Sequence, residues 1–222
     1  MEKRYDVLQK LVQEKLSYAA HDLDHVLRVY HLCILLARHE QNVDLDVLIP
    51  AVLLHDIARA KEDEDISGEI DHAVLGAKMA ETILLDLNYD GELISKICQC
   101  ILTHRFRSGN PPKSIEAKIL YDADKLDIIG ATGIARSFML AGQHGERLYT
   151  DVSIDDYIRE NIGENGRIKD PSKHTTYIEF ELKLKKLPDR LFTDEAKKIA
   201  EQRIAYMSQF FETLKQEITG DI

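Results

Sequence analysis

A histidine and an aspartate stand side by side at the end of an apolar run in this chain of 222 residues. The run covers residues 51–54 and leads directly into His55 and Asp56. Burying two such polar side chains is costly unless a partner satisfies them. Imidazole and carboxylate groups are both common ligands of divalent metals. We therefore interpret His55 and Asp56 as one half of a metal site.

Two further residues, His25 and Asp124, are candidates for the other half of the site. Both fall in segments with helical periodicity, and helical bundles build metal sites from side chains on neighbouring helices. Two imidazoles with two carboxylates suit Mn, Mg, Fe, Co or Ni better than a closed zinc site. His21 competes with His25 as the ligand, because the two have i,i+4 spacing on one helical face. The role of His21 stays open at this point.

Apolar residues recur at helical spacing along most of the chain, and no segment alternates as a strand would. We expect an all-α bundle that forms one domain over residues 1–222. Its metal-binding core would cover about 18–140, followed by additional C-terminal helices over about 141–222. Asp46 and Ser114 are expected to cap helices at their N-termini. The expected helices cover residues 7–16, 21–39, 46–60, 71–87, 92–105, 114–129, 134–140, 154–162, 177–186 and 193–218.

Two segments interrupt this helical pattern. Residues 61–65 are almost all acidic, and we expect them to form a solvated surface loop. Residues 142–173 are rich in glycine and aspartate, which predicts a long loop containing the short helix at 154–162. The role of the 142–173 loop is not indicated by its sequence.

Charge and composition exclude several classes of function. The net charge of -10 repels a nucleic-acid backbone, so polymeric DNA or RNA is not expected as a partner. A metal and a few local cations could still attract a small anion. No apolar run reaches the length of about 18 residues that a membrane span needs. The start of the chain lacks the apolar core of a signal peptide, and three cysteines favour free thiols, so we expect a cytoplasmic location.

Three motifs together resemble the signature of the HD superfamily of metal-dependent phosphohydrolases. They read HDLDHVLRV at 21–29, LLHDI at 53–57 and DADKLD at 122–127. Their order and spacing match the superfamily from residue 21 to about 140. Segments 129–136 and 187–193 resemble one stand-alone bacterial and archaeal branch.

The resemblance implies an all-helical HD-domain fold in which His25, His55, Asp56 and Asp124 bind a divalent metal ion. It also implies an enzyme that hydrolyses small phosphorylated metabolites, most often nucleotides, and for this branch nucleoside triphosphates or related nucleotides. One departure concerns Glu179, which stands where relatives often have a histidine. Any substrate contact from that segment is therefore in doubt.

The expected reaction uses metal-activated water, with positioned cations stabilising the charge that develops on phosphorus. Asp56 or Asp127 would accept the proton, although Asp127 could equally form a structural ion pair. Lys125 is the best candidate for a lysine that faces the substrate. The expected substrate-binding residues are Arg28, Arg59, His72, His104, Arg105 and Lys125.

Several of these assignments have open alternatives. In the superfamily, histidines at the places of His72 and His104 bind phosphate or a second metal, whereas a surface or capping role is the simpler explanation. Arg28 could form a structural pair with a carboxylate. The whole chain could also be a non-catalytic module that binds nucleotide or metal, or a hydrolase of guanosine tetraphosphate alarmones. Neither the number of metal ions nor the oligomeric state is indicated, with a homodimer among the alternatives.

Overall fold

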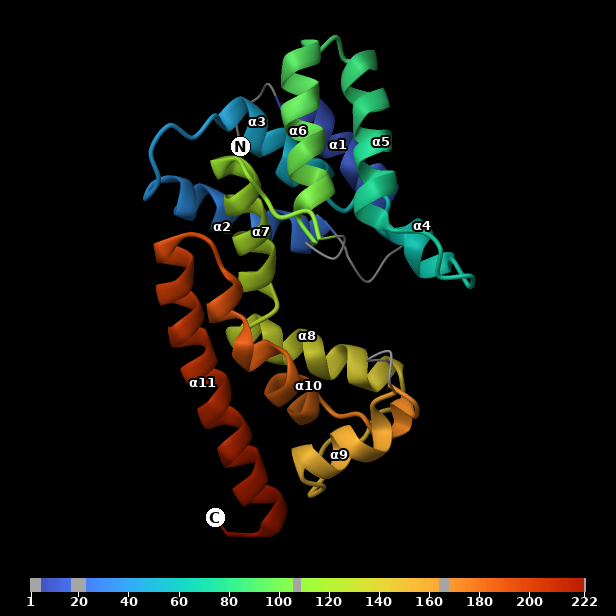
Figure 1. The fold of residues 1–222 in the computed structure, drawn as a ribbon, viewed down its shortest axis with the longest axis vertical. Coiled ribbons are helices and arrows are strands. Elements are labelled where there is room, and N and C mark those ends of the chain that lie inside the picture. The colour runs from blue at the N-terminus through green and yellow to red at the C-terminus, as the bar shows by residue number, and fades with distance from the viewer. Residues whose placement is uncertain (1–4, 17–22, 106–108, 164–167, 222) are drawn as a thin grey trace. The chain divides into compact units, whose positions relative to one another are not determined.

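The computed structural model describes residues 5–16, 23–105, 109–163 and 168–221 (Figure 1). Within these ranges the secondary structure is helical, apart from one isolated antiparallel bridge between Ile162 and Ile168. The all-α fold class is therefore confirmed. The chain divides into two compact units, Met1–Asp124 and Lys125–Ile222. Its organisation as a single domain stays a prediction.

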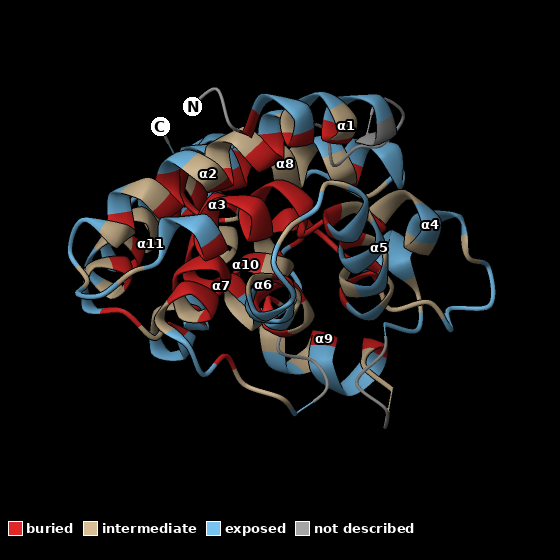
Figure 2. Ribbon diagram, turned by 90° about the horizontal axis from the view of Figure 1, so that it is seen from above, coloured by how far each residue is buried: buried red, intermediate tan, exposed pale blue. Residues whose placement is uncertain are grey.

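The first unit is built around α3 (Leu45–Leu54), which is buried without interruption from Val47 to Leu54. Figure 2 shows this helix as buried along most of its length. Helices α1, α2 and α6 pack against it, and α5 packs along α6. A helix that is apolar on all sides belongs in the centre of a bundle. The other helices of this unit are α1 (Asp6–Leu16), α2 (Leu23–Ala37), α4 (Arg59–Glu64), α5 (His72–Asp86), α6 (Gly91–Thr103) and the greater part of α7 (Ile115–Asp127).

The expected helix over 46–60 is wrong in two respects. Its N-cap is Asp44, whose side chain accepts a hydrogen bond from the Asp46 backbone, so Asp46 itself lies inside α3. The helix also ends at Leu54, and residues 55–58 form a turn before α4 begins. Hydrogen bonds from Ile57 N to Leu54 O (3.1 Å) and from Arg59 N to Asp56 O (2.8 Å) tighten the chain there. His55 and Asp56 therefore lie in a tight turn and not on a regular helix.

The expected surface loop at 61–65 is also wrong for most of its length, because Arg59–Glu64 forms α4. Glu62 on this helix is only 18% exposed and contacts other polar side chains. Ser114, in contrast, caps α7 as expected, since its hydroxyl accepts a hydrogen bond from Ala117 N at 3.2 Å.

The second unit is organised around the long helix α11 (Asp194–Thr219), which packs against α8 (Gly130–Gln143). Helix α8 starts earlier than the expected 134, because Gly130 begins it at a φ of 79°. Helix α9 (Ile154–Asn161) lies close to its expected position within the irregular segment 142–173. Phe211 of α11 stacks at 4.9 Å on Phe180 of α10. The remaining elements are α10 (Thr176–Leu182) and the 3-10 turns Pro171–Lys173, Leu184–Lys186 and Pro188–Arg190.

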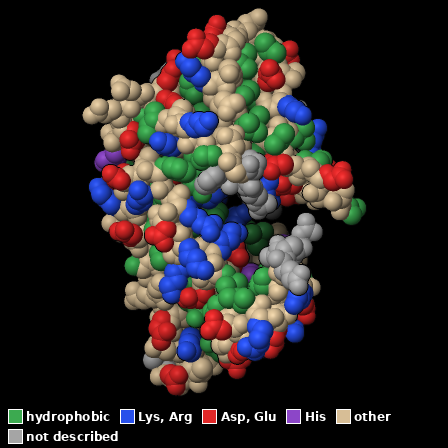
Figure 3. Space-filling view, viewed as in Figure 1, with side chains coloured by type: hydrophobic (Ala, Val, Ile, Leu, Met, Phe, Trp, Pro, Cys, Tyr) green, Lys and Arg blue, Asp and Glu red, His purple; other side chains and the backbone are tan. Residues whose placement is uncertain are grey.

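Surface and thiol chemistry agree with the composition. Figure 3 shows acidic and basic side chains interspersed over one face. Among the described residues, no helix is both long and apolar enough to cross a membrane. All three cysteines are free thiols; Cys33 and Cys100 are buried and Cys98 is half-buried. Burial raises the pKa of Cys100 to about 12 and that of Cys98 to about 11, so neither is a reactive thiolate.

Candidate metal centre

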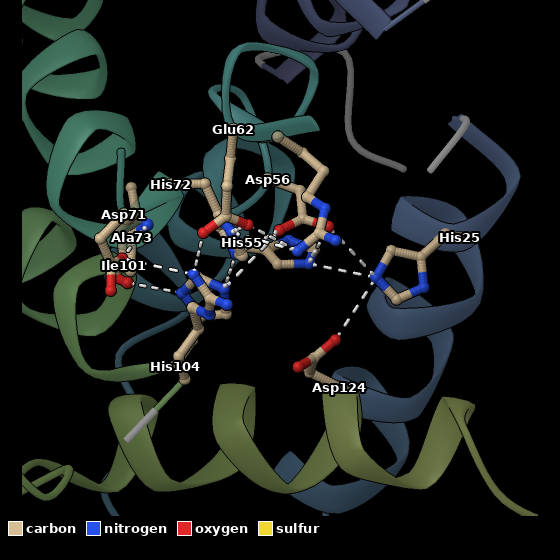
Figure 4. Close-up of polar contacts among 12 residues, drawn as sticks. His25, His55, Asp56, Glu62, Asp71, His72, Ala73, Ile101, His104 and Asp124 are labelled. Atoms are coloured by element: carbon tan, nitrogen blue, oxygen red, sulfur yellow. Dashed lines mark hydrogen bonds and ion pairs between the residues drawn. The ribbon is translucent and has the colours of Figure 1, made fainter. Parts of the chain in front are cut away.

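The structure brings the four predicted ligands together. Helix α2 supplies His25, the turn after α3 supplies His55 and Asp56, and α7 supplies Asp124 (Figure 4). The His25 Nε2 atom lies 3.4 Å from His55 Nε2 and 3.4 Å from an Asp124 oxygen. The Oδ2 atom of Asp56 lies 3.7 Å from His25 Nε2 and 3.8 Å from His55 Nε2. These donor atoms could share one divalent ion.

A second group of ligand-type atoms adjoins the first through Asp56. His72 comes from the first residue of α5, and His104 follows the last residue of α6. Their Nε2 atoms lie 3.2 and 3.6 Å from Asp56 Oδ1. His25 and His55 lie near the other oxygen of this carboxylate, Oδ2. The two Nε2 atoms lie 3.1 Å from each other. Asp56 is thus shared between two pairs of imidazoles.

The tautomers of these histidines favour a cation between them. His55 Nδ1 donates to Val52 O at 2.7 Å, and His104 Nδ1 donates to Ile101 O at 2.6 Å. His72 Nδ1 donates to Glu62 at 2.6 Å. A neutral imidazole that uses its proton at Nδ1 turns a lone pair outward at Nε2. His72 and His104 therefore point two lone pairs at each other unless a proton or a cation lies between them.

Distances and charges also fit a metal. Atoms that bind one ion at about 2.0–2.2 Å lie about 3 Å apart, close to the separations in both groups. Burial lowers the pKa of His55 to about 4, so this side chain is neutral at pH 7, as a ligand must be. Burial alone would raise the pKa of Asp56, but the neighbouring imidazoles of His55, His104 and His72 hold that pKa well below its usual value. Asp56 therefore carries the negative charge that a cation needs.

Glu62 is a residue of this site that the sequence did not reveal. It accepts hydrogen bonds from His72, from Arg59 at 2.9 Å and from Arg105. Burial would raise the pKa of Glu62, but the bonds from His72 and Arg105 lower it to about 2. A carboxylate behind an imidazole fixes the orientation of a metal-binding histidine. The one available signal is that Glu62 falls one helical turn after Arg59, in a run that reads as plain surface charge.

The three arginines predicted to bind the substrate differ in their contacts and burial. Arg59 pairs with Glu62 and Asp63, yet its Nε atom is buried without a hydrogen-bond partner among the described residues. Arg105 pairs with Glu62 and Asp71. Arg28 is half-buried on α2, one turn past His25.

Lys125 and Asp127 belong to the second unit, at the end of α7. Asp127 is buried, and its charge acts on Arg203 of α11, which favours the structural alternative for this residue. His21 lies outside the described residues.

Known proteins are similar to this chain in sequence. The HD domain family matches residues 22–129. The uncharacterized protein YpgQ of Bacillus subtilis strain 168 is 31% identical over 206 residues, which cover 91% of this chain and 86% of that protein.

Solved structures are similar over almost the whole chain. The structure of Bacillus subtilis YpgQ in complex with ADP matches with a TM-score of 0.71 at 29% identity, covering 97% of this chain and 95% of that one. An HD-superfamily hydrolase from Bacillus thuringiensis matches with a TM-score of 0.72 at 28% identity, covering 98% and 97%. Motifs, fold and relatives agree, and the chain belongs to the HD superfamily.

Proposed function

We propose that this protein is a metal-dependent phosphohydrolase of small phosphorylated metabolites, with nucleoside triphosphates or related nucleotides as its substrates. The observation that carries the proposal is the buried Asp56 carboxylate held between two pairs of imidazoles. Phosphate esters and anhydrides are the substrates for which such a cation site is useful, because anionic oxygens repel a nucleophile. The ADP bound by the Bacillus subtilis relative supports a nucleotide.

In this proposal His25, His55, Asp56 and Asp124 hold one divalent ion, which is Mn, Mg, Co, Ni or Fe. His72 and His104, with the other oxygen of Asp56, hold a second ion or a substrate phosphate. A bound divalent ion supplies neutralisation of phosphoryl oxygens and a water of lowered pKa. The mixed nitrogen and oxygen donor set favours these metals over a closed structural zinc site.

The remaining roles fall to side chains around the cluster. Both oxygens of Asp56 face imidazole nitrogens, so we assign Asp56 as a ligand and not as the base. Arg59 keeps its predicted role in binding the substrate, because its planar guanidinium suits phosphate oxygens. Arg105, Arg28 and Lys125 keep their predicted roles in binding the substrate. For Asp127, burial and the charge of Arg203 support a structural role over the predicted role as proton acceptor.

The test is release of phosphate or pyrophosphate from a panel of nucleotides with each metal added in turn. The panel includes the eight common nucleoside triphosphates and guanosine tetraphosphate, which separates the alarmone alternative. We expect release from at least one nucleotide with one of these metals, and none after chelation. Binding of nucleotide without release under every metal would favour the non-catalytic module instead.

A further inference from the structure

A cavity of about 400 Å³ lies within the first unit, apart from the metal centre. It is lined by the start of α3, one face of α6, the connection between α6 and α7, and the first turn of α7. No candidate metal ligand is among its lining residues. Sites for small organic ligands have volumes of about 300–1,000 Å³. The cavity is therefore large enough to hold a small metabolite.

Glu116 is a largely buried acid in the wall of this cavity. The residue is 8% exposed, and its Oε1 atom accepts a hydrogen bond from the Asp44 backbone at 2.9 Å. In the part of the chain that the structure describes, Glu116 forms no ion pair. Burying a carboxylate without a counter-charge is costly, so such groups usually pair with a cation. A cationic group of a ligand would meet this need.

The second oxygen of Glu116 can be reached from the cavity. This atom, Oε2, has no hydrogen-bond partner among the described residues. It is not sealed in the core either, because the fully buried side-chain atoms without a partner in the described chain are Arg59 Nε and Thr176 Oγ1. The exposed part of Glu116 therefore includes Oε2, and it opens into the cavity that this residue lines.

Two lysines bring positive charge to the same cavity. Lys96 of α6 pairs with Glu92 at 2.6 Å, and Glu92 is not part of the wall. That bond, followed by the charges of Asp44 and Glu116, raises the pKa of Lys96, so this lysine is protonated and already has a partner. Lys113 precedes α7, is exposed, and forms no ion pair with a described residue. Its charge is therefore open to a ligand.

The charges that remain for a ligand are one anion and one cation. Asp44, the other acidic residue of the wall, already caps α3 by accepting from the Asp46 backbone at 2.9 Å. Glu116 and Lys113 line one cavity but lie too far apart to pair with each other. A ligand with a positive and a negative group contacts both at once, whereas a simple cation or anion is repelled by one of them.

We propose that this cavity binds a zwitterionic amino acid. Its ammonium group donates to Glu116 Oε2, and its carboxylate accepts from Lys113 Nζ. The amide of Gln99, which also lines the cavity, offers donors and an acceptor to further polar atoms of the ligand. Val47 and Pro111 provide an apolar surface for its side chain. The inference goes beyond the proposed hydrolysis, because it requires neither a metal nor turnover.

The test is calorimetric titration of the full-length protein with the common amino acids, one at a time, in the presence of a chelator. The chelator removes divalent ions, to which amino acids could otherwise bind at the metal centre. For an amino acid that binds, the titration is repeated with its N-acetyl derivative, which lacks the ammonium group, and with the amine that lacks its carboxylate. These analogues test both charges on the unaltered protein.

Two variants test the same charges from the side of the protein. Glu116→Gln removes the anion but retains an acceptor for the Asp44 backbone, and Lys113→Gln removes the cation. Glu81→Gln and Lys78→Gln, both exposed on α5 and outside the cavity wall, are the matched controls. Thermal unfolding of each free variant shows whether it folds.

We expect at least one amino acid to bind. Its N-acetyl derivative should bind about tenfold more weakly or less, and Glu116→Gln should have the same effect, as for a lost hydrogen bond to a charged group. The amine analogue and Lys113→Gln should each weaken binding about two- to fivefold, because this lysine is exposed. Both control variants should bind as the wild type does.

Failure of every amino acid to bind would overturn the proposal. Equal affinity of a folded Glu116→Gln protein, or equal affinity for the N-acetyl derivative, would overturn it as well. An amine that binds as tightly as its parent amino acid would indicate a site for simple cations and would contradict the proposal too. All titrations are done without metal, so their result does not depend on whether the protein hydrolyses nucleotides.

Discussion

Asp56 joins the two halves of the candidate metal centre, so its replacement should affect both. In Asp56→Asn one carboxylate oxygen becomes an NH₂ group, which directs N–H donors toward atoms that should bind a cation. We expect metal affinity to fall by more than about 100-fold, beyond the loss typical of residues that only support ligands. Nucleotide hydrolysis should fall with it. Metal content after dialysis, measured by inductively coupled plasma mass spectrometry, checks this prediction.

Asp86→Asn is the matched control, because Asp86 is an exposed carboxylate on α5. It should retain the wild-type metal content and activity. Circular dichroism of both variants verifies that each one folds. An Asp56→Asn protein with full metal content would show that the cluster is not the metal centre.

Glu62 should act on the metal centre through His72. Glu62→Gln removes the anion that holds His72 Nδ1 and pairs with Arg59 and Arg105. We expect metal affinity at the His72 and His104 position to fall about 10–100-fold, while binding at His25 and His55 is retained. Calorimetric titration with Mn should show only the second binding step weakened.

Glu64→Gln, an exposed carboxylate on the same helix, serves as the control for Glu62→Gln. It should leave both binding steps unchanged. If Glu62→Gln binds metal as the wild type does, Glu62 forms ion pairs but does not support the metal site.

These two residues also show what can be predicted from sequence at this scale. Asp56 is recognisable because it forms a motif with its neighbour His55. His25 and Asp124 lie in two further motifs whose order and spacing match those of the superfamily. Glu62 has no such mark, since it lies among five consecutive charged residues. Its role depends on α4 turning back so that Glu62 reaches His72, which is a property of the fold. Sequence therefore predicts ligand-type residues better than the residues that orient them.

At the scale of elements, the start of α8 depends on two glycines. A Cβ atom on Gly133 would lie 2.4 Å from the backbone oxygen of Ile128, which cannot move away cheaply. We expect Gly133→Ala to lower the free energy of unfolding by about 1–3 kcal/mol, as overpacking typically does. Gly142→Ala is the control near the other end of α8, where a Cβ would meet nothing within 4 Å. That variant should be neutral or gain about 0.5–1 kcal/mol.

Urea denaturation of both glycine variants measures these changes. Equal stability of Gly133→Ala and Gly142→Ala would contradict the close approach at Ile128. The two glycines also explain why the start of α8 was predicted four residues too late. Gly130 and Gly133 look like helix breakers in sequence, whereas in the structure they allow the chain to turn tightly into α8.

Helix α10 should lose stability in acid through Glu179. Burial would raise the pKa of this carboxyl, but His174 and Lys183 lower it from 4.5 to about 2. A carboxyl with a depressed pKa stabilises the folded state above its unfolded pKa, and this contribution is lost as the pH falls toward the folded pKa. Glu179→Gln should therefore reduce the free energy of unfolding at pH 7 by on the order of 2–3 kcal/mol.

Between about pH 4.5 and pH 2 the difference between wild type and Glu179→Gln should shrink toward zero. Chemical denaturation of both proteins across this range is the measurement. Glu181→Gln, also on α10, removes the ion pair with Lys185 of the following 3-10 turn and should change stability by less than about 1 kcal/mol at either pH. A difference for Glu179→Gln that did not change with pH would rule out its ionised form as the cause.

At the scale of the whole molecule, the sequence predicted the helical class and most helix positions, but it placed the end of the metal-binding core near residue 140, whereas the compact units divide after Asp124. The boundary between them falls within α7, after Asp124. The apolar pattern runs without a break through this helix, and no glycine, proline or polar linker marks the division. Helical periodicity predicts which residues of α7 are buried, but it carries no information on which unit each of them packs against.

The metal centre should therefore couple to stability unequally along the chain. All six candidate ligands lie between His25 and Asp124, on helices that are distant in sequence, so a bound ion would hold α2, α5, α6 and α7 to the turn after α3. A ligand present at 100 times its dissociation constant stabilises the folded state by about 2.7 kcal/mol. For a chain of this length we expect the transition that includes residues 23–124 to shift upward by about 5–10 °C.

Hydrogen exchange with and without Mn locates this stabilisation. Amides of α2, α5 and α6 should gain protection on adding metal, whereas those of α11 should change little, because no ligand comes from that helix. Asp56→Asn should show neither the thermal shift nor the added protection. If metal raised the protection of α11 as much as that of α2, α5 and α6, the whole chain would be one cooperative unit. Ions held in the first unit would then also stabilise the second.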